Sequence, residues 1–141
     1  MRASRPLVTV VCLAALVAAG CSDDDADSTP TVAGLAGKSF ESTDVEGHEM
    51  VAGTNVAMAF DEDGVAVSAG CNTLRGAITI DGGALQAGPM AQTMMACSDD
   101  LMTQDAFLAE FFSSGPTITL DGRTLTLAGS GATIVADVQD G

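Results

Sequence analysis

Short runs of alternating apolar and polar residues, each closed by a turn, constrain this chain most. Large apolar residues stand at every second position in Val56, Met58 and Phe60, and the alternation returns at Val65, Val67 and Ala69. Asp61–Gly64 separates the two runs, and Asp and Gly tolerate the left-handed backbone of tight turns. Because a period of two places apolar side chains on one face, this stretch predicts a β-hairpin.

Similar strand patterns recur on both sides of this hairpin. Phe40 is the expected core residue of a first strand, and Asp81–Gly83 is expected to turn a later strand back on itself. The predicted strands lie at 38–45, 74–80 and 84–87, followed near the end of the chain by a three-stranded meander at 117–120, 124–128 and 133–138.

A single helix is expected between these two groups of strands. Ser98 is a suitable N-cap, Asp99 and Asp100 favour the positive end of the helix dipole, and Gly115-Pro116 ends the pattern. The apolar stripe consists of Leu101, Phe107, Leu108, Phe111 and Phe112, which predicts core packing and gives no sign of a cofactor site. The elements together predict an α+β fold dominated by β-structure. We expect a curled antiparallel sheet, or partly open barrel, of about seven to eight strands, with the helix inserted before the last strands.

The N-terminal region has the layout of an export signal. Arg2 and Arg5 precede an apolar run from Leu7 to Ala18 that is too short to span a membrane. Val17-Ala18-Ala19-Gly20-Cys21 resembles a bacterial lipobox, with Ala18 in place of the usual larger aliphatic residue. We therefore predict a lipoprotein signal peptide at 1–20, with lipid on Cys21 as the membrane anchor. The alternative is an ordinary signal peptide with an incidental Cys.

Four domain boundaries follow from this interpretation: a signal peptide at 1–20, a lipidated Cys with an acidic flexible tether at 21–34, a folded domain at 35–138, and a tail at 139–141. The tether carries four Asp residues and almost nothing to bury. A calcium loop in that segment is the weaker alternative, because the glycine and glutamate of an EF-hand are missing. The expected location is extracytoplasmic: on the outer face of the cell membrane, or periplasmic or outer-membrane where the organism has one.

The charge balance excludes one class of partner. The formal net charge is -14, and both Trp and Tyr are absent, so the chain offers no phosphate-binding surface and poor aromatic platforms for the stacking of bases. We therefore expect no nucleic-acid partner. The acidity is consistent with solubility and self-repulsion.

Cys71 and Cys97 are the cysteines of the predicted folded domain. Two cysteines in an exported domain most often pair, and the bond would stabilise this domain by roughly 3.5 kcal/mol. Two buried free thiols are one alternative. A reactive thiol is another, but it needs a base, and His48 is the chain's single His and lies in a polar segment that predicts a solvated loop. A metal site built from these three residues is short of ligands.

Gly70-Cys71-Asn72, Arg75-Gly76 and Thr93-Met94-Met95-Ala96-Cys97 follow one another along the chain. This order resembles that of the META domain, the family that includes the heat-inducible protein HslJ. The resemblance covers about residues 35–138, with Phe40 in place of the usual Trp and Ile78 in place of an aromatic residue. It implies a small curled antiparallel sheet with one helix, a frequent lipid anchor, links to envelope stress, and no known catalytic residues or cofactor. The family motif residues are Gly70, Cys71, Asn72, Gly76, Thr93, Met95, Ala96 and Cys97.

Three side-chain types near the cysteines admit both structural and functional interpretations. Asn72 follows a turn and is expected to bond its own backbone, and Arg75 is expected to pair with a carboxylate. The methionines Met90, Met94, Met95 and Met102 predict packing between helix and sheet, with a Met-rich binding surface or a copper(I) site as the alternative.

The resulting functional hypothesis is a non-catalytic, lipid-anchored envelope module, not an enzyme, that binds another envelope protein, a peptide or a small apolar ligand. The first alternative is a thiol-dependent redox factor or enzyme that uses Cys71 and Cys97. The second is a soft-metal binder that uses the methionines.

Overall fold

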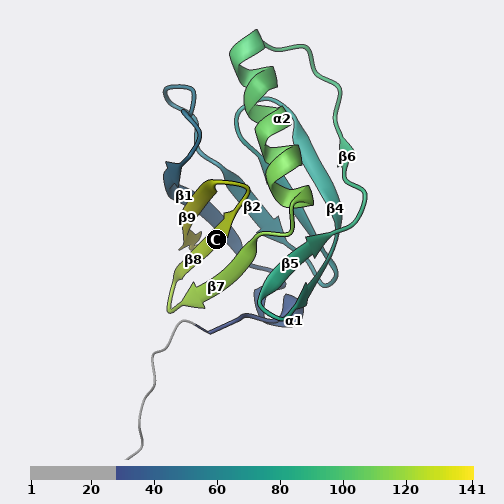
Figure 1. The fold of residues 1–141 in the computed structure, drawn as a ribbon, viewed down its shortest axis with the longest axis vertical. Coiled ribbons are helices and arrows are strands. Elements are labelled where there is room, and N and C mark those ends of the chain that lie inside the picture. Colours follow the sequence, from purple (N-terminus) through teal and green to yellow (C-terminus); the bar gives the residue numbers. More distant parts are fainter. Residues whose placement is uncertain (1–27) are drawn as a thin grey trace, which may run out of the picture.

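A computed structural model describes residues 28–141, and the predictions for the signal peptide and Cys21 lie outside this range. The described chain forms two helices and nine strands, and the strands make one antiparallel sheet (Figure 1). The elements are α1 (Val32–Leu35), β1 (Ser39–Glu46), β2 (Ala57–Phe60), β3 (Gly64–Ser68), β4 (Thr73–Asp81), β5 (Ala84–Ala87), β6 (Ala91–Gln92), α2 (Asp99–Ser113), β7 (Thr117–Asp121), β8 (Thr124–Gly129) and β9 (Ala132–Gln139).

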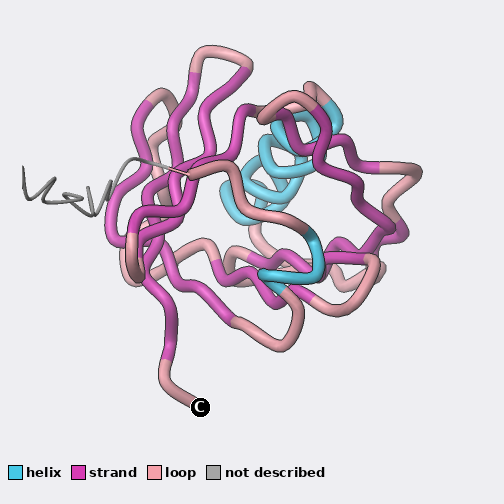
Figure 2. The backbone as a smooth tube through the Cα atoms, turned by 90° about the horizontal axis from the view of Figure 1, so that it is seen from below, coloured by secondary structure: helices cyan, strands magenta, loops and turns pink. Residues whose placement is uncertain are grey.

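The sheet closes on itself as a barrel. The strands follow the order β3-β2-β1-β9-β8-β7-β5-β4-β6, and β3 also pairs with β4, so every barrel strand has two neighbours. Viewed from below, the strands form a ring with α1 across the near end (Figure 2). The predicted β-dominated fold with a helix before the last strands is confirmed, and closure goes beyond the partly open barrel that we expected.

The β2–β3 hairpin and the C-terminal meander form as the alternation predicts. In the hairpin, Met58 pairs with Val67 and Phe60 with Val65, and all four side chains are buried. In the meander, Ile118 lies opposite Leu127, which lies opposite Ile134, so one row of aliphatic side chains crosses three strands. Such cross-strand contacts are the unit of sheet stabilisation.

Two elements were missed by the sequence analysis because both are short. Thr31 caps α1 by accepting a hydrogen bond from the Gly34 backbone nitrogen (3.0 Å), and Leu35 is fully buried. β6 pairs with the start of β4 through Leu74 and Arg75, and both of its residues are exposed. Neither element carries enough residues to show a period.

The last residues of the predicted tether are part of the folded domain. Ser28 forms an antiparallel bridge with Leu120, with backbone hydrogen bonds of 3.3 and 3.0 Å, and Pro30 is buried. Backbone pairing at Ser28 and burial of Leu35 hold this stretch against the lower end of the barrel (Figure 1).

Helix α2 contributes to the same hydrophobic core as the strands. Leu108, Phe111 and Phe112 are buried as predicted, whereas Leu101 and Phe107 are half-buried at the margin. Ser98 occupies the N-cap position, but its side chain makes no capping hydrogen bond. Two polar residues of the helix, Gln104 and Asp105, are buried with the apolar ones.

Candidate functional site

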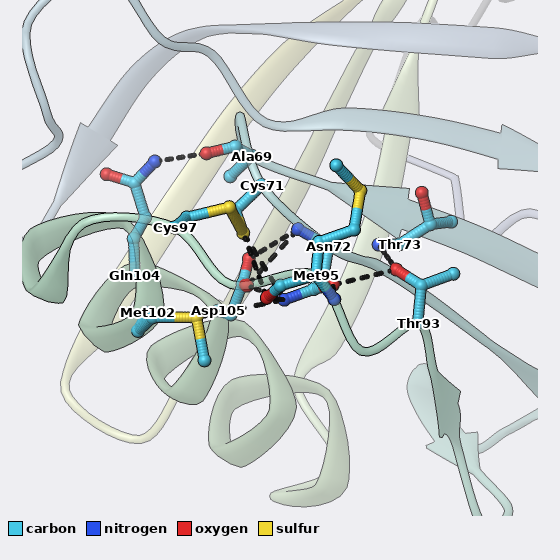
Figure 3. Close-up of a disulfide and its surroundings, with 10 residues drawn as sticks. All are labelled: Ala69, Cys71, Asn72, Thr73, Thr93, Met95, Cys97, Met102, Gln104 and Asp105. Atoms are coloured by element: carbon cyan, nitrogen blue, oxygen red, sulfur yellow. Dashed lines mark hydrogen bonds between the residues drawn. A yellow bond between two sulfur atoms is a disulfide. The ribbon is translucent and has the colours of Figure 1, made fainter.

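The two cysteines are joined in a disulfide, which confirms the predicted pairing. Cys71 and Cys97 have an S–S distance of 1.99 Å and Cα atoms 6.2 Å apart. The bond ties the turn that precedes β4 to the segment that leads into α2 (Figure 3). In this state neither sulfur is a free thiol, so the site as it stands offers no nucleophilic cysteine.

Asn72, which is itself buried, lies at the centre of a polar network beside the disulfide. Its Oδ1 accepts hydrogen bonds from the Met95 backbone nitrogen (2.7 Å) and from Thr93 Oγ1 (2.9 Å). Its Nδ2 donates to Asp105 Oδ2 (2.9 Å) and lies 3.3 Å from the Met95 carbonyl oxygen. We call Asn72, Thr93, Met95 and Asp105 the polar network (Figure 3). The prediction that Asn72 bonds its own backbone was wrong, because its partners come from two distant segments.

Asp105, which lies in α2, completes the polar network by accepting hydrogen bonds from Asn72. The residue is 1% exposed, and its carboxyl group also accepts from the Asn72 backbone nitrogen at 3.2 Å. Both hydrogen-bonding groups of Asn72 that face α2 therefore meet one carboxyl group. A buried carboxyl group is tolerated only when its oxygens are bonded in this way.

Gln104 makes a second set of bonds from the adjacent helical position. Its Oε1 accepts from the Val51 backbone nitrogen (2.8 Å), and its Nε2 donates to Thr54 Oγ1 (3.0 Å) and to the Ala69 carbonyl oxygen. Gln104 and Asp105 were missed by the sequence analysis. A signal was present, because both fall on the helical stripe between Leu101 and Leu108.

The remaining motif residues shape the backbone around this network. Gly70 has φ +101°, and a Cβ there would lie 2.9 Å from Thr54 Cγ2, so the position requires glycine. Gly76 lies in β4, where a Cβ would meet the Pro89 carbonyl oxygen at 3.2 Å. Ala96 is exposed between Met95 and Cys97.

The methionines do not pack as a group. Met90 is half-buried against the core, but Met94, Met95 and Met102 are 93%, 60% and 41% exposed. The packing prediction was therefore wrong for these three. Met102 Sδ lies 3.9 Å from Asn72 Nδ2, which places it directly over the polar network.

His48 and Arg75 lie apart from any chemistry of the cysteines. His48 is half-buried and stacks on Phe107, with ring centroids 4.0 Å apart, so it is not the solvated histidine that we expected. A shallow depression of about 590 Å³ beside it is lined by Glu49, Met50, Asp100 and Thr103. Arg75 pairs with Asp61 at 3.5 Å, and both side chains are largely exposed.

Three further observations concern residues 28–141. No group of three His, Cys, Asp or Glu side chains lies close enough to hold a metal ion in this part of the chain. Neither described helix has the length and apolar composition that crossing a membrane requires. Every buried side-chain nitrogen or oxygen in the same range has a hydrogen-bond partner, so the polar network is satisfied internally.

The barrel, the inserted helix and the two cysteine motifs define a known class of domain. The family model described as the META domain matches residues 33–140, and the chain therefore belongs to the META-domain family. No curated protein matches the sequence.

Two solved structures share this fold. One is a protein solved by NMR with 25% identity and a TM-score of 0.61, a match covering 76% of this chain and 93% of that one. The other, an NMR structure of a protein from Burkholderia xenovorans, has 14% identity and a TM-score of 0.63, covering 98% of this chain and 99% of that one. The second likeness concerns the fold alone.

Proposed function

We propose that this protein is an exported, lipid-anchored and non-catalytic module of the cell envelope that binds a partner. One observation carries the proposal. The first described residues, at Ser28, pair with Leu120 near the lower end of the barrel, whereas the start of α2 lies at the upper end (Figure 1). A lipid on Cys21 would therefore hold the lower end near a membrane and leave the disulfide, the polar network and the exposed methionines facing away from it.

The state of the cysteines supports a binding role over a catalytic one. A thiol enzyme needs a free thiolate beside a base, but Cys71 is bonded to Cys97, and His48 stacks on Phe107. The Asp105 carboxyl group, which is buried beside the disulfide, accepts its hydrogen bonds from Asn72. Intact mass after alkylation, with and without reduction, tests this part. We expect alkylation of Cys71 and Cys97 only after reduction, and rapid alkylation without it would favour the thiol enzyme.

Processing of the full chain in a bacterial host tests the anchor. We expect the protein to enter the detergent phase of a phase-separating detergent, with a mass that lacks residues 1–20 and includes acyl chains on Cys21. Cys21→Ala should move it to the aqueous phase, whereas Cys12→Ala, a matched change inside the apolar run, should not. Wild-type protein in the aqueous phase, cleaved but without acyl chains, would refute the lipoprotein.

Exposure of three thioethers favours a second candidate, a soft-metal binder. Met94, Met95 and Met102 are accessible, and thioether sulfur is a preferred ligand of copper(I). Copper(I) should then raise the melting temperature, and Met→Leu changes at these positions should abolish that shift. The absence of any shift with the wild-type protein would exclude the candidate.

A further inference from the structure

The large apolar side chains that are exposed in residues 28–141 come from two neighbouring segments. They are Met94, Met95 and Met102, which we call the methionine surface. Met94 and Met95 follow β6, and Met102 lies in the first turns of α2. The Met95 carbonyl oxygen and Met102 Sδ both face Asn72 Nδ2, at 3.3 and 3.9 Å, so the two segments meet there (Figure 3). A lone exposed apolar side chain needs no explanation, but a cluster of them marks an interaction site.

Hydrogen bonds and the disulfide fix the two segments that carry the methionine surface. The Met95 backbone is fixed to Asn72 through its nitrogen at 2.7 Å, Cys97 is bonded to Cys71, and Asp105 fixes the helix that carries Met102. A segment that is ordered before it binds loses less conformational entropy on docking. Methionine side chains, being unbranched and polarizable, still adapt to the shape of a partner.

The surroundings of the methionine surface are acidic. Asp99 and Asp100 open α2 and are exposed, and Asp99 is three positions from Met102, on the same side of the helix. The neighbouring cation on β4, Arg75, is bound to Asp61. With a net charge of -14, a second copy of this chain or an anionic lipid surface would be repelled, whereas a basic partner would be attracted.

Among the strands of residues 28–141, β6 lies beside the methionine surface and has a free edge. β6 ends the strand order, and Ala91 and Gln92 bond to β4 on one side. Extended peptides add to such edges through main-chain hydrogen bonds, while alternate side chains enter neighbouring pockets or cover apolar residues.

We propose that the methionine surface docks a basic, amphipathic and extended segment of another protein. Its apolar side chains cover Met94, Met95 and Met102, its Lys or Arg side chains face Asp99 and Asp100, and its backbone extends the sheet at β6. This inference rests on the proposed binding role and specifies the site and the chemistry of the partner.

A synthetic peptide of alternating Leu and Lys, labelled with a fluorophore, is the probe. The full-chain protein is placed in nanodiscs of zwitterionic lipid, and binding is followed by anisotropy, with empty nanodiscs and a Ser–Lys peptide of equal charge as controls. We expect binding of the Leu–Lys peptide to loaded discs alone, weakened by added salt. If the protein fails to enter the discs, the lipid anchor has failed, and the same titration in solution still tests the docking.

Matched variants locate the site. Met94→Gln with Met95→Gln keeps side-chain size and should weaken binding by about tenfold or more, whereas Met94→Leu with Met95→Leu should retain it. Asp99→Asn with Asp100→Asn should weaken binding more than Glu62→Gln with Asp63→Asn, an acidic pair at the far end of β3. Wild-type affinity in the Gln variant, equal binding of the Ser–Lys peptide, or no binding of the Leu–Lys peptide would each overturn the proposal.

Discussion

The C-terminal meander and the region beneath α2 use opposite means to hold the same barrel together. Leu125, Leu127 and Ile134 are fully buried among aliphatic neighbours on adjacent strands. Under α2, by contrast, a disulfide and the bonds of Asn72 and Asp105 join segments that are distant in sequence. Tight turns and aliphatic packing hold the meander strands together, whereas the region under α2 depends on the disulfide and a few specific polar contacts. The meander should therefore tolerate the exchange of one aliphatic side chain for another of similar size, whereas the region under α2 should not tolerate exchange of its polar side chains.

The largest effect should come from a cavity in the meander. Leu127→Ala should lower the free energy of unfolding by about 4 kcal/mol, because Leu127 is fully buried and its neighbours are held in strands that cannot collapse into the space. Urea unfolding measures it. Thr126→Ala, at the half-buried adjacent position, should cost much less. A smaller loss for Leu127→Ala than for changes in the polar network would reverse the comparison.

Reduction of the Cys71–Cys97 bond should come next. With a sequence separation of 26, the chain-entropy model gives a loss of roughly 3.5 kcal/mol. We expect hydrogen exchange to accelerate first in residues 91–98, while β7, β8 and β9 stay protected. Uniform acceleration over the whole barrel would indicate that the two regions do not unfold separately.

Removal of the Asp105 carboxyl group should cost somewhat less. Asp105→Ala leaves the Asn72 backbone nitrogen buried without its partner, so we expect a loss of about 2–3 kcal/mol in urea unfolding. Asp105→Asn keeps an acceptor oxygen and should recover part of that loss. Equal stability of the two variants would show that the hydrogen bond contributes little.

The smallest loss of stability is expected at Gly70, where a control variant separates backbone strain from contact with a neighbouring side chain. Gly70→Ala should cost about 1–2 kcal/mol, because a positive φ and contact with Thr54 act together. Gly53→Ala provides the control, since Gly53 has φ +81° but nothing within 4 Å of its Cβ position, and it should lose less in thermal unfolding. An equal loss for both would assign the effect to φ alone.

The same comparison explains what the sequence could predict. Alternation placed the β2–β3 hairpin and the meander, because a period of two is visible in the chain and nearest-neighbour strands pair through short turns. Closure of the barrel was not predicted, because the pairing of β1 with β9 joins strands from the two ends of the domain and leaves no local pattern.

The disulfide of the site was predicted from the sequence, but the polar network beside it was missed. Two cysteines in an exported domain indicate a disulfide from residue type alone. The bond from Asn72 to Asp105 spans 33 positions, and the partner of a buried amide cannot be chosen without the fold. Exposure of Met94 was missed for a related reason, since apolar type predicts burial but not which side of an extended segment faces the core.

Pairing of the first barrel strand with the last has a consequence for the order of folding. β1 runs antiparallel to β9 from Ser39 opposite Gln139 to Glu46 opposite Thr133, so the ring cannot close until the final strand is available. Contacts between the two ends of a chain close the longest loop and slow the search for the native state. During synthesis the emerging chain therefore keeps two open edges until its last strand arrives, and it is in that interval that it is most exposed to proteases and to aggregation.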